Sequence, residues 1–324
     1  MAEIRFNPLT RDWVMIASHR QARPNMPKDW CPFCPGSGKV PDDFTVLKYD
    51  NDFPALRQDP PIPDDTAGGV YRTAEAYGKC EVILYSKNHT ETLPELSDTH
   101  VKKLVDLWCE RFEALRQDEK IKYIFIFENR GELVGVSMPH PHGQIYGYPF
   151  LPKKLELEHE SFQLHRKKTG NCLLCDMVKE ENRFEKRIIF ENEGFTVFLP
   201  FFCEYPYGVY AVPKRCVRYI TDLTENERFL LGQTLKQTVG MLDSLFDFAF
   251  PYMMCMHNAP VNLQETEDFH FHIQFFPPMR SADKQKFNAS SETGAWAHCN
   301  PTAPEERAEE LRIAYKRFIT KENR

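Results

Sequence analysis

The chain repeats one pattern in its two halves, and this duplication limits the possible folds more than any other feature of the sequence. Two ligand-type residues that end an apolar strand pattern, His89 and Cys216, are 127 positions apart. The helix-capping residues Ser97 and Thr224 have the same offset of 127. Two histidine motifs follow, at 140–144 and 270–274, with an offset of 130. Such agreement at several positions indicates two copies of one structural unit.

Each copy contains a helix followed by a strand pattern. Apolar residues recur at helical spacing after Ser97 and again after Thr224, which predicts two helices with buried stripes. Glu227 stands three residues after Thr224, so a capping box is expected there. Apolar runs typical of strands follow at 123–127 and 252–256. We therefore expect repeats at residues 1–160 and 161–324, joined by the charged stretch 153–168, with a C-terminal helix entered near Pro304.

The first histidine motif, His140-Pro141-His142-Gly143-Gln144, is the part of the chain best suited to covalent phosphorus chemistry. Residues two apart on an extended backbone share a face, so one imidazole can bind a metal while His142 attacks a phosphate. Imidazole is neutral at cytoplasmic pH because its usual pKa is about 6.5, and a hydrogen bond from one ring nitrogen would fix the tautomer. We expect Gly135 and Gly143 to let the backbone approach a phosphate, with Ser137 and Gln144 as donors. The alternative is a pair of structural histidines in a turn.

The chain has ten cysteines, and their spacing favours metal binding over a disulfide framework. The segment Cys31-Pro32-Phe33-Cys34 resembles a zinc knuckle, and a second Cys-x-x-Cys pair begins 141 positions later, at Cys172. The repeat assigns the remaining ligands of each pair. The predicted sets are Cys31, Cys34, His89 and His140 in the first half and Cys172, Cys175, Cys216 and His270 in the second. Each set supplies four ligands, as in zinc sites that stabilise a fold without taking part in catalysis. A metal in the first set, which includes His140, would hold the strand of His142 in place. For the second set, the alternative is four residues buried independently.

Charge and hydropathy exclude several classes of protein. The chain has 324 residues and a formal net charge of −6 at pH 7, which disfavours nucleic acid as a partner. The first five residues contain no apolar signal core, and no later stretch approaches the roughly 18 apolar residues of a membrane span. We therefore expect a soluble cytoplasmic protein that binds neither nucleic acid nor membranes.

These motifs closely resemble those of the galactose-1-phosphate uridylyltransferase family, a two-repeat branch of the histidine-triad superfamily. The resemblance runs nearly end to end, through residues 18–24, 51–56 and 89–96 and above all Gly135-x-Ser137-x-x-His140-Pro-His142-Gly-Gln144. It implies an α+β fold of two tandem histidine-triad-like repeats, each an antiparallel sheet with packed helices. It also implies a homodimeric nucleotidyltransferase.

The resemblance assigns roles to individual residues. His142 would take a uridylyl group from UDP-glucose and pass it to galactose 1-phosphate by ping-pong double displacement. The residues implied around the nucleotide and its phosphates are Arg20, Arg23, Asn51, Asp52, Asn129, Ser137 and Gln144. Lys286 and Glu292 would contact the sugar phosphate and the hexose hydroxyls at the neighbouring subunit's site.

The second half departs from part of the family pattern. Some members bind iron through one Glu and three His, and the matching positions here are Glu158, His257, His272 and, in place of the fourth ligand, Gln274. Those members lack Cys172, Cys175 and Cys216, which favours zinc over iron as the second metal.

Three other functions remain open from the sequence. The tail 292–305 resembles a branch that includes a plant ADP-glucose phosphorylase, so adenylyl transfer through the same histidine is the main alternative. A zinc-knuckle interaction module without turnover is a second alternative, although it leaves the residues around His142 unexplained. A nucleotide hydrolase is a third, and it would release UMP without a sugar phosphate.

Overall fold

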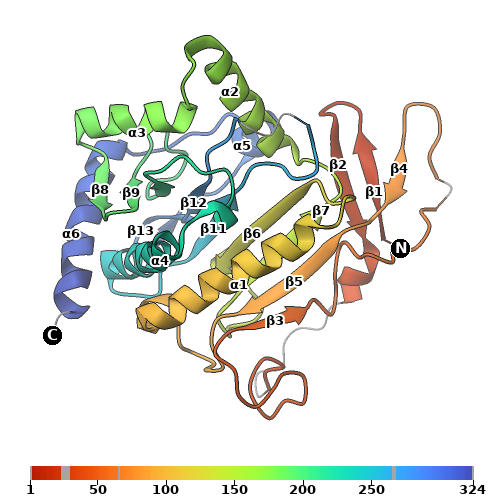
Figure 1. Cartoon of the computed structure of the whole chain (residues 1–324), viewed down its shortest axis with the longest axis horizontal. Coiled ribbons are helices and arrows are strands. Elements are labelled where there is room, and N and C mark those ends of the chain that lie inside the picture. Colours follow the sequence, from red (N-terminus) through yellow and green to blue (C-terminus); the bar gives the residue numbers. More distant parts are fainter. Residues whose placement is uncertain (1, 23–29, 65, 265–267, 323–324) are drawn as a thin grey trace.

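One antiparallel sheet runs through both halves of the chain in the computed structural model, which describes residues 2–22, 30–64, 66–264 and 268–322 (Figure 1). Its strands follow the order β3-β5-β7-β6-β11-β12-β10-β9-β8. In that order their bounds are Leu47–Asp50, Lys79–Leu84, His142–Tyr148, Tyr123–Arg130, Tyr252–His257, His272–Phe276, Tyr210–Pro213, Phe195–Phe198 and Ile188–Glu191.

The strand order is symmetrical about the pairing of β6 with β11. On one side lie β7 and β5, and on the other lie their counterparts in the second repeat, β12 and β10. Arg130 of β6 lies opposite Tyr252 of β11 in an antiparallel ladder. The predicted α+β fold with antiparallel sheets is confirmed, and the structure adds that the two sheets join edge to edge. This seam covers one strand edge of each repeat that would otherwise expose unpaired backbone groups.

Helices α1 (Asp98–Arg116) and α4 (Glu225–Phe246) cover one face of the sheet (Figure 1). Both predicted caps are present, because Ser97 Oγ accepts from His100 N and Thr224 Oγ1 accepts from Glu227 N, each at 3.2 Å. Thr224 N donates to Glu227 Oε2 at 2.8 Å and completes the capping box. The apolar stripes of both helices belong to one core with the inward side chains of the central strands.

The remaining helices lie around the second repeat. Helix α6 (Pro304–Glu322) confirms the expected C-terminal helix and packs on α4, where the ring of Phe318 fills the space beside Gly240. The charged stretch expected between the repeats is helix α2 (Lys153–Thr169), whose C-cap residue is Gly170 with a φ of 78°. The division at residues 160 and 161 falls inside α2 and stays a prediction. Helices α3 (Leu173–Phe184) and α5 (Ser290–Ala295) complete this half.

Smaller elements frame the sheet. A three-stranded sheet has the order β2-β1-β4, with bounds Asp12–Ala17, Ala2–Asn7 and Thr73–Glu75. Strands β13 (Met279–Ser281) and β14 (Lys284–Gln285) form a hairpin. The 3-10 turns are η1 (Ser18–Ala22), η2 (Leu93–Glu95), η3 (Glu132–Val134) and η4 (Ile220–Asp222). Turns η2 and η4 precede α1 and α4 and are also offset by 127 positions.

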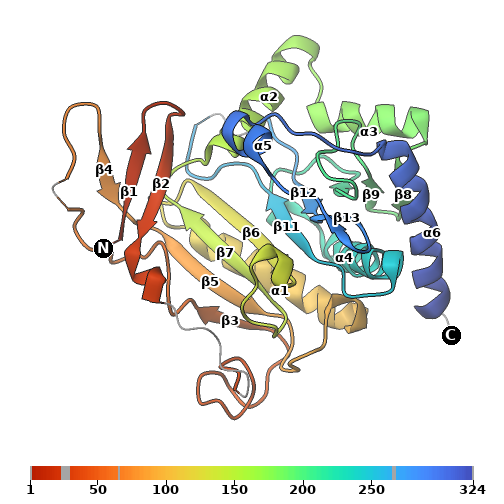
Figure 2. The same ribbon diagram turned by 180° about the vertical axis from the view of Figure 1, so that it is seen from behind.

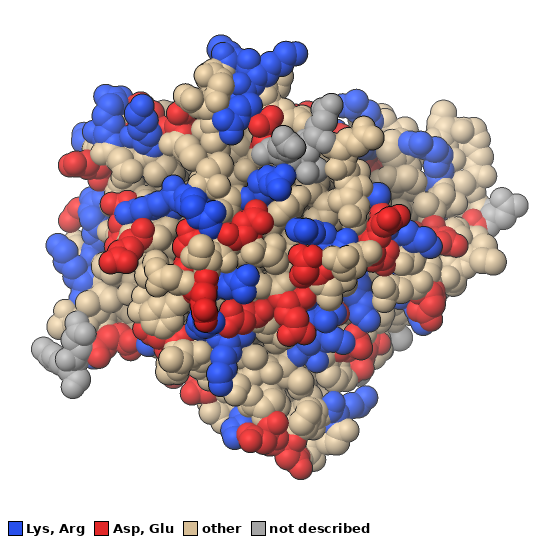
Figure 3. Space-filling model, in the orientation of Figure 1, with Lys and Arg blue, Asp and Glu red and all other residues tan. Residues whose placement is uncertain are grey.

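The surface carries charges of both signs. On the face shown in Figure 3, Lys and Arg side chains are interspersed with Asp and Glu, in keeping with the net charge of −6. Among the residues that the structure describes, every helix is too short or too polar to cross a bilayer.

Candidate active site

A cavity of about 480 Å³ opens on the face of the sheet opposite α1, and His142 lies in its wall. Figure 2 looks onto this face, with α1 behind the strands. Strand alternation selects the wall residues, because Gln144 of β7 lies between Val82 of β5 and Phe127 of β6. The next residue along β7, Ile145, instead joins the core under α1. The motif therefore places its chemical groups on the open face of the sheet.

The imidazole of His142 is held in one tautomer. Its Nδ1 donates to the carbonyl oxygen of His140 at 2.8 Å, so the lone pair is on Nε2. The ring of Phe33, from the loop between Cys31 and Cys34, packs edge-on against both His140 and His142, with centroid distances of 6.0 and 5.8 Å. An imidazole held in this tautomer is suited to attack an electrophilic phosphorus through Nε2.

Most of the predicted substrate contacts surround the same cavity. Its wall includes Arg20, Asn51, Asp52, Asn129, Ser137 and Gln144. Tyr146 donates to Gln144 Oε1 at 3.2 Å, which directs the nitrogen end of that amide away from the tyrosine as a donor. Gly135 also lines the cavity and has a φ of 82°, a conformation that glycine adopts without strain. Arg23 lies outside the described residues.

Several wall residues were not predicted from the sequence. Aromatic rings from separate segments form part of the wall, together with one additional cation; these residues are Trp30, Phe33, Tyr49, Phe127, Tyr146 and Lys39. Phe33 could have been found, because it stands inside the Cys-x-x-Cys motif. Strand alternation could have found Phe127 and Tyr146, whereas Lys39 and Trp30 carry no local signal. Rings and cations together suit a ligand with a base and phosphates.

The structure corrects the expected reason for Gly143. A Cβ built on this residue would lie 2.6 Å from the Tyr85 hydroxyl, on the helix-covered side of the sheet. The absence of a side chain at Gly143 therefore makes room for a buried phenol on the face of the sheet away from the cavity.

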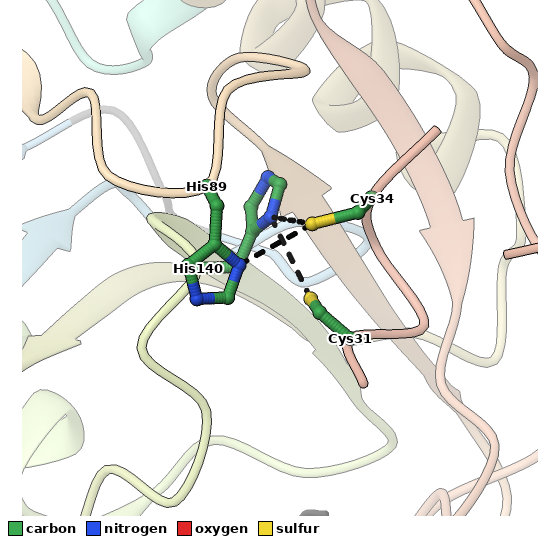
Figure 4. A group of neighbouring side chains, drawn as sticks. All are labelled: Cys31, Cys34, His89 and His140. Atoms are coloured by element: carbon green, nitrogen blue, oxygen red, sulfur yellow. Dashed lines mark hydrogen bonds between the residues drawn. The ribbon is translucent and has the colours of Figure 1, made fainter. Parts of the chain in front are cut away.

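The side chains of the first predicted metal set point toward one another (Figure 4). The ligand atoms of Cys31, Cys34, His89 and His140 all lie within 4.8 Å of one another. Cys34 Sγ is 3.3 Å from His89 Nδ1 and 3.7 Å from His140 Nδ1. The other ring nitrogen of His140 donates to the Ser86 carbonyl at 2.8 Å, an arrangement that orients metal-binding histidines. Two sulfurs and two nitrogens at this spacing fit a tetrahedral zinc ion.

The second set repeats this geometry. The ligand atoms of Cys172, Cys175, Cys216 and His270 also lie within 4.8 Å of one another. His270 Nδ1 is 3.5 Å from each of Cys172 Sγ and Cys175 Sγ, and its Nε2 donates to the Pro213 carbonyl at 3.0 Å. The alternative of four independently buried residues is therefore wrong.

A third group contains Glu158, His257 and His272, and Gln274 completes it. Gln274 Nε2 donates to Glu158 Oε1 at 3.2 Å and to His272 Nε2 at 2.9 Å. An amide nitrogen does not ligate a cation, and Gln274 Oε1 is buried without a partner among the described residues. The residues here do not fit a site of one Glu and three His.

His272 is the counterpart of His142 in the second repeat. The two histidines share their local backbone hydrogen bond but differ in whether a ligand can reach the ring. His272 Nδ1 donates to the His270 carbonyl at 2.9 Å, as His142 does to His140. His272 is only 3% exposed, and burial lowers its pKa to about 4. Only His142 of the two lines the cavity of about 480 Å³.

Lys286 and Glu292 do not line the cavity of their own chain. They lie after β14 and in α5, and Lys286 Nζ is 3.5 Å from Glu292 Oε1. The Lys286 ammonium also lies 5.2 Å from the centroid of the Tyr205 ring.

Family models match both halves of the chain. The model of the galactose-1-phosphate uridyl transferase N-terminal domain matches residues 1–152, and that of the C-terminal domain matches residues 156–313. The chain belongs to the galactose-1-phosphate uridylyltransferase family. It is therefore an enzyme of the transferase class.

Individual members of this family are similar over their full lengths. The galactose-1-phosphate uridylyltransferase of Thermotoga maritima is 41% identical over 314 residues, which are 96% of this chain and 98% of the relative. A solved uridylyltransferase structure is 31% identical, with a TM-score of 0.90 over 97% of this chain and 99% of the other. An Arabidopsis thaliana ADP-glucose phosphorylase is 23% identical, covers 96% of this chain and 99% of its own, and has a TM-score of 0.74. That last likeness is one of fold.

Proposed function

We propose that this enzyme moves a uridylyl group from UDP-glucose to galactose 1-phosphate through a covalent intermediate on His142, as a step of galactose metabolism in the Leloir pathway. The observation that best supports this proposal is the position of the His142 imidazole. His142 lies in the wall of the cavity of about 480 Å³, and its Nδ1 donates to the His140 carbonyl, so that Nε2 keeps the lone pair for attack.

The reaction consists of two displacements at one phosphorus. His142 Nε2 forms a bond to the α-phosphorus of UDP-glucose, and the bond from that phosphorus to the bridging oxygen breaks. The oxygen leaves with glucose 1-phosphate. A phosphate oxygen of galactose 1-phosphate then attacks the uridylyl phosphorus, the phosphorus–nitrogen bond breaks, and UDP-galactose leaves. Because the second displacement is the reverse of the first with a different sugar phosphate, the same hydrogen-bond donors can stabilise both transition states.

The cavity wall supplies groups for each part of the nucleotide. We assign Arg20, Asn129, Ser137 and Gln144 to the phosphates and sugar, because each carries a donor and lines the cavity. Asn51 and Asp52 are assigned to the nucleoside; Asp52 is held by a hydrogen bond of 2.9 Å from Tyr49. Arg23 is assigned to the phosphates by the family resemblance alone.

Zinc is the metal proposed for both Cys and His sets. Thiolate and imidazole donors at tetrahedral spacing support this choice over iron. Both sets are complete without water, so the metals would supply rigidity: the first set holds His140, whose carbonyl fixes His142.

The proposed assembly rests on the family resemblance. We propose a cytoplasmic homodimer in which Lys286 and Glu292 reach the hexose phosphate at the partner's cavity. Neither residue lines the cavity of its own chain, which supports this assignment. The repeats 1–160 and 161–324 remain the proposed domains.

The test is mass spectrometry of the protein after incubation with UDP-glucose alone. We expect release of glucose 1-phosphate and one uridylyl adduct, mapped to His142 and absent from His142→Asn. The matched control is His272→Asn, which changes the equivalent histidine of the second repeat and should retain the adduct. An adduct on another residue, or none, would overturn the proposal.

Parallel incubation with ADP-glucose separates the two nucleotidyl transfers. We expect the uridylyl adduct to form much faster than an adenylyl adduct. Preferential labelling by ADP-glucose would instead make the enzyme an adenylyltransferase or ADP-sugar phosphorylase that uses the same histidine.

A further inference from the structure

A buried carboxyl group, Glu128, links the two repeats from β6, the strand that pairs with the strand of His142. It lies on the helix-covered side of β6 and is 5% exposed. Tyr85, which follows β5 in the first repeat, donates to Glu128 Oε2 at 3.0 Å. Tyr252, the first residue of β11 in the second repeat, donates to Glu128 Oε1 at 2.9 Å. Each oxygen of one carboxyl group thus binds a phenol from a different repeat.

The phenol of Tyr85 also sets the position of β7. Its hydroxyl occupies the space that a side chain at Gly143 would take, since a Cβ there would lie 2.6 Å from the oxygen and 3.2 Å from Cε1. The backbone of Tyr85 donates to the Pro141 carbonyl at 3.3 Å. The ring is buried and packs edge-on against Trp108 of α1, with centroids 5.9 Å apart. The residues on both sides of His142 therefore contact Tyr85.

Burying the carboxyl group of Glu128 would cost free energy if its hydrogen bonds to the two tyrosines were lost. Arg130, two residues along β6, is paired with Asp243 of α4 at 2.6 Å. Burial raises the pKa of Glu128 to about 7, against the opposing effects of Arg130 and the two tyrosines. A buried carboxyl with this environment is a frequent feature of functional sites, and here it does not face the substrate cavity.

We propose that Glu128 is a positioning residue for His142. Glu128 holds the Tyr85 hydroxyl against Gly143 of β7 and also binds Tyr252 of the second repeat. These two contacts fix the position of β7, and with it His142, relative to the second repeat. The inference rests on the proposed function, because it requires His142 to be the nucleophile. A displacement of about 1 Å at a reacting group costs on the order of a hundredfold in rate, so small movements of β7 would be visible in the kinetics.

Single-turnover formation of the uridylyl adduct from UDP-glucose tests this role. Tyr85→Phe, Glu128→Gln and Tyr252→Phe should each slow adduct formation on the order of tenfold, with the UDP-glucose concentration for half-maximal rate nearly unchanged. Tyr207→Phe is the matched control, because it removes another buried phenol that donates to a carboxylate, Glu310, at 2.8 Å. It should retain the wild-type rate, and thermal unfolding of each variant reports any loss of stability.

A suppression experiment separates positioning from general stability. Gly143→Ala should lose adduct formation because its methyl group meets the Tyr85 hydroxyl. Adding Tyr85→Phe should restore at least part of that rate, although Tyr85→Phe slows the wild type. Failure to restore it, or wild-type rates in Glu128→Gln and Tyr252→Phe, would overturn the positioning role. A wild-type protein that forms no adduct on His142 would instead overturn the proposed function first.

Discussion

At the scale of single residues, identical local chemistry has opposite outcomes in the two repeats. His142 and His272 share a hydrogen bond from Nδ1 to the carbonyl two residues before. His272 is enclosed by Gln274 and Glu158, and its lowered pKa of about 4 reflects burial. His142 instead meets a cavity. Access of a ligand to the ring therefore depends on the surrounding side chains and not on the motif alone.

Gln144 should control whether the intermediate waits for a sugar phosphate. An amide donates hydrogen bonds but cannot accept a proton from water, so it does not promote hydrolysis. We expect Gln144→His to raise acceptor-free hydrolysis of UDP-glucose to UMP by on the order of tenfold or more. Following UMP release with and without galactose 1-phosphate measures this effect, and an unchanged hydrolysis rate would refute the explanation.

At the scale of elements, each Cys and His set anchors the start of one strand. His140 precedes β7 and His270 precedes β12, and each ring donates to a carbonyl of the neighbouring segment. The first strand begins at the proposed nucleophile, whereas the second begins at a buried histidine. Equivalent anchors should therefore have different functional consequences.

A matched pair of cysteine variants tests that difference. Cys34→Ala and Cys175→Ala should each lose one equivalent of zinc and lower the free energy of unfolding by more than about 2 kcal/mol. Only Cys34→Ala should slow uridylyl adduct formation well below the unfolding temperature, because His140 holds His142. Metal analysis, thermal unfolding and adduct kinetics are the measurements. Equal slowing in both variants would contradict a local role for the first metal.

At the scale of the whole molecule, one chain does not bring all the predicted site residues together. The first repeat surrounds His142 with six of the predicted contacts, while Lys286 and Glu292 pair with each other in the second repeat. The continuous sheet fixes the two repeats relative to one another through the β6–β11 seam. In the proposed homodimer, the second copy would bring Lys286 and Glu292 to this cavity.

Mixing two inactive variants tests this arrangement. Co-expressed His142→Asn and Lys286→Ala chains should recover about a quarter of wild-type activity, because half of the dimers are mixed and each has one intact site. The control pair, His142→Asn with Asn129→Ala, should recover none, since both residues serve the cavity of their own chain. No recovery in the first pair would place Lys286 at its own chain's site or outside the reaction.

The sequence alone determined what depends on local pattern. Offsets of 127 and 130 revealed the two repeats, helical spacing and capping residues located α1 and α4, and Cys and His spacing grouped eight ligands correctly into two clusters. These features could be predicted because each depends on residues that are near one another in sequence or related by the repeat.

Only the tertiary structure decided what depends on packing between distant segments. It joined the two sheets at β6 and β11, buried His272 while leaving a cavity at His142, and placed Tyr85 behind Gly143. The same glycine in a motif can serve a ligand or a neighbouring side chain. Which one it serves is set by the residues that fill the space beside it, and those lie far away along the chain.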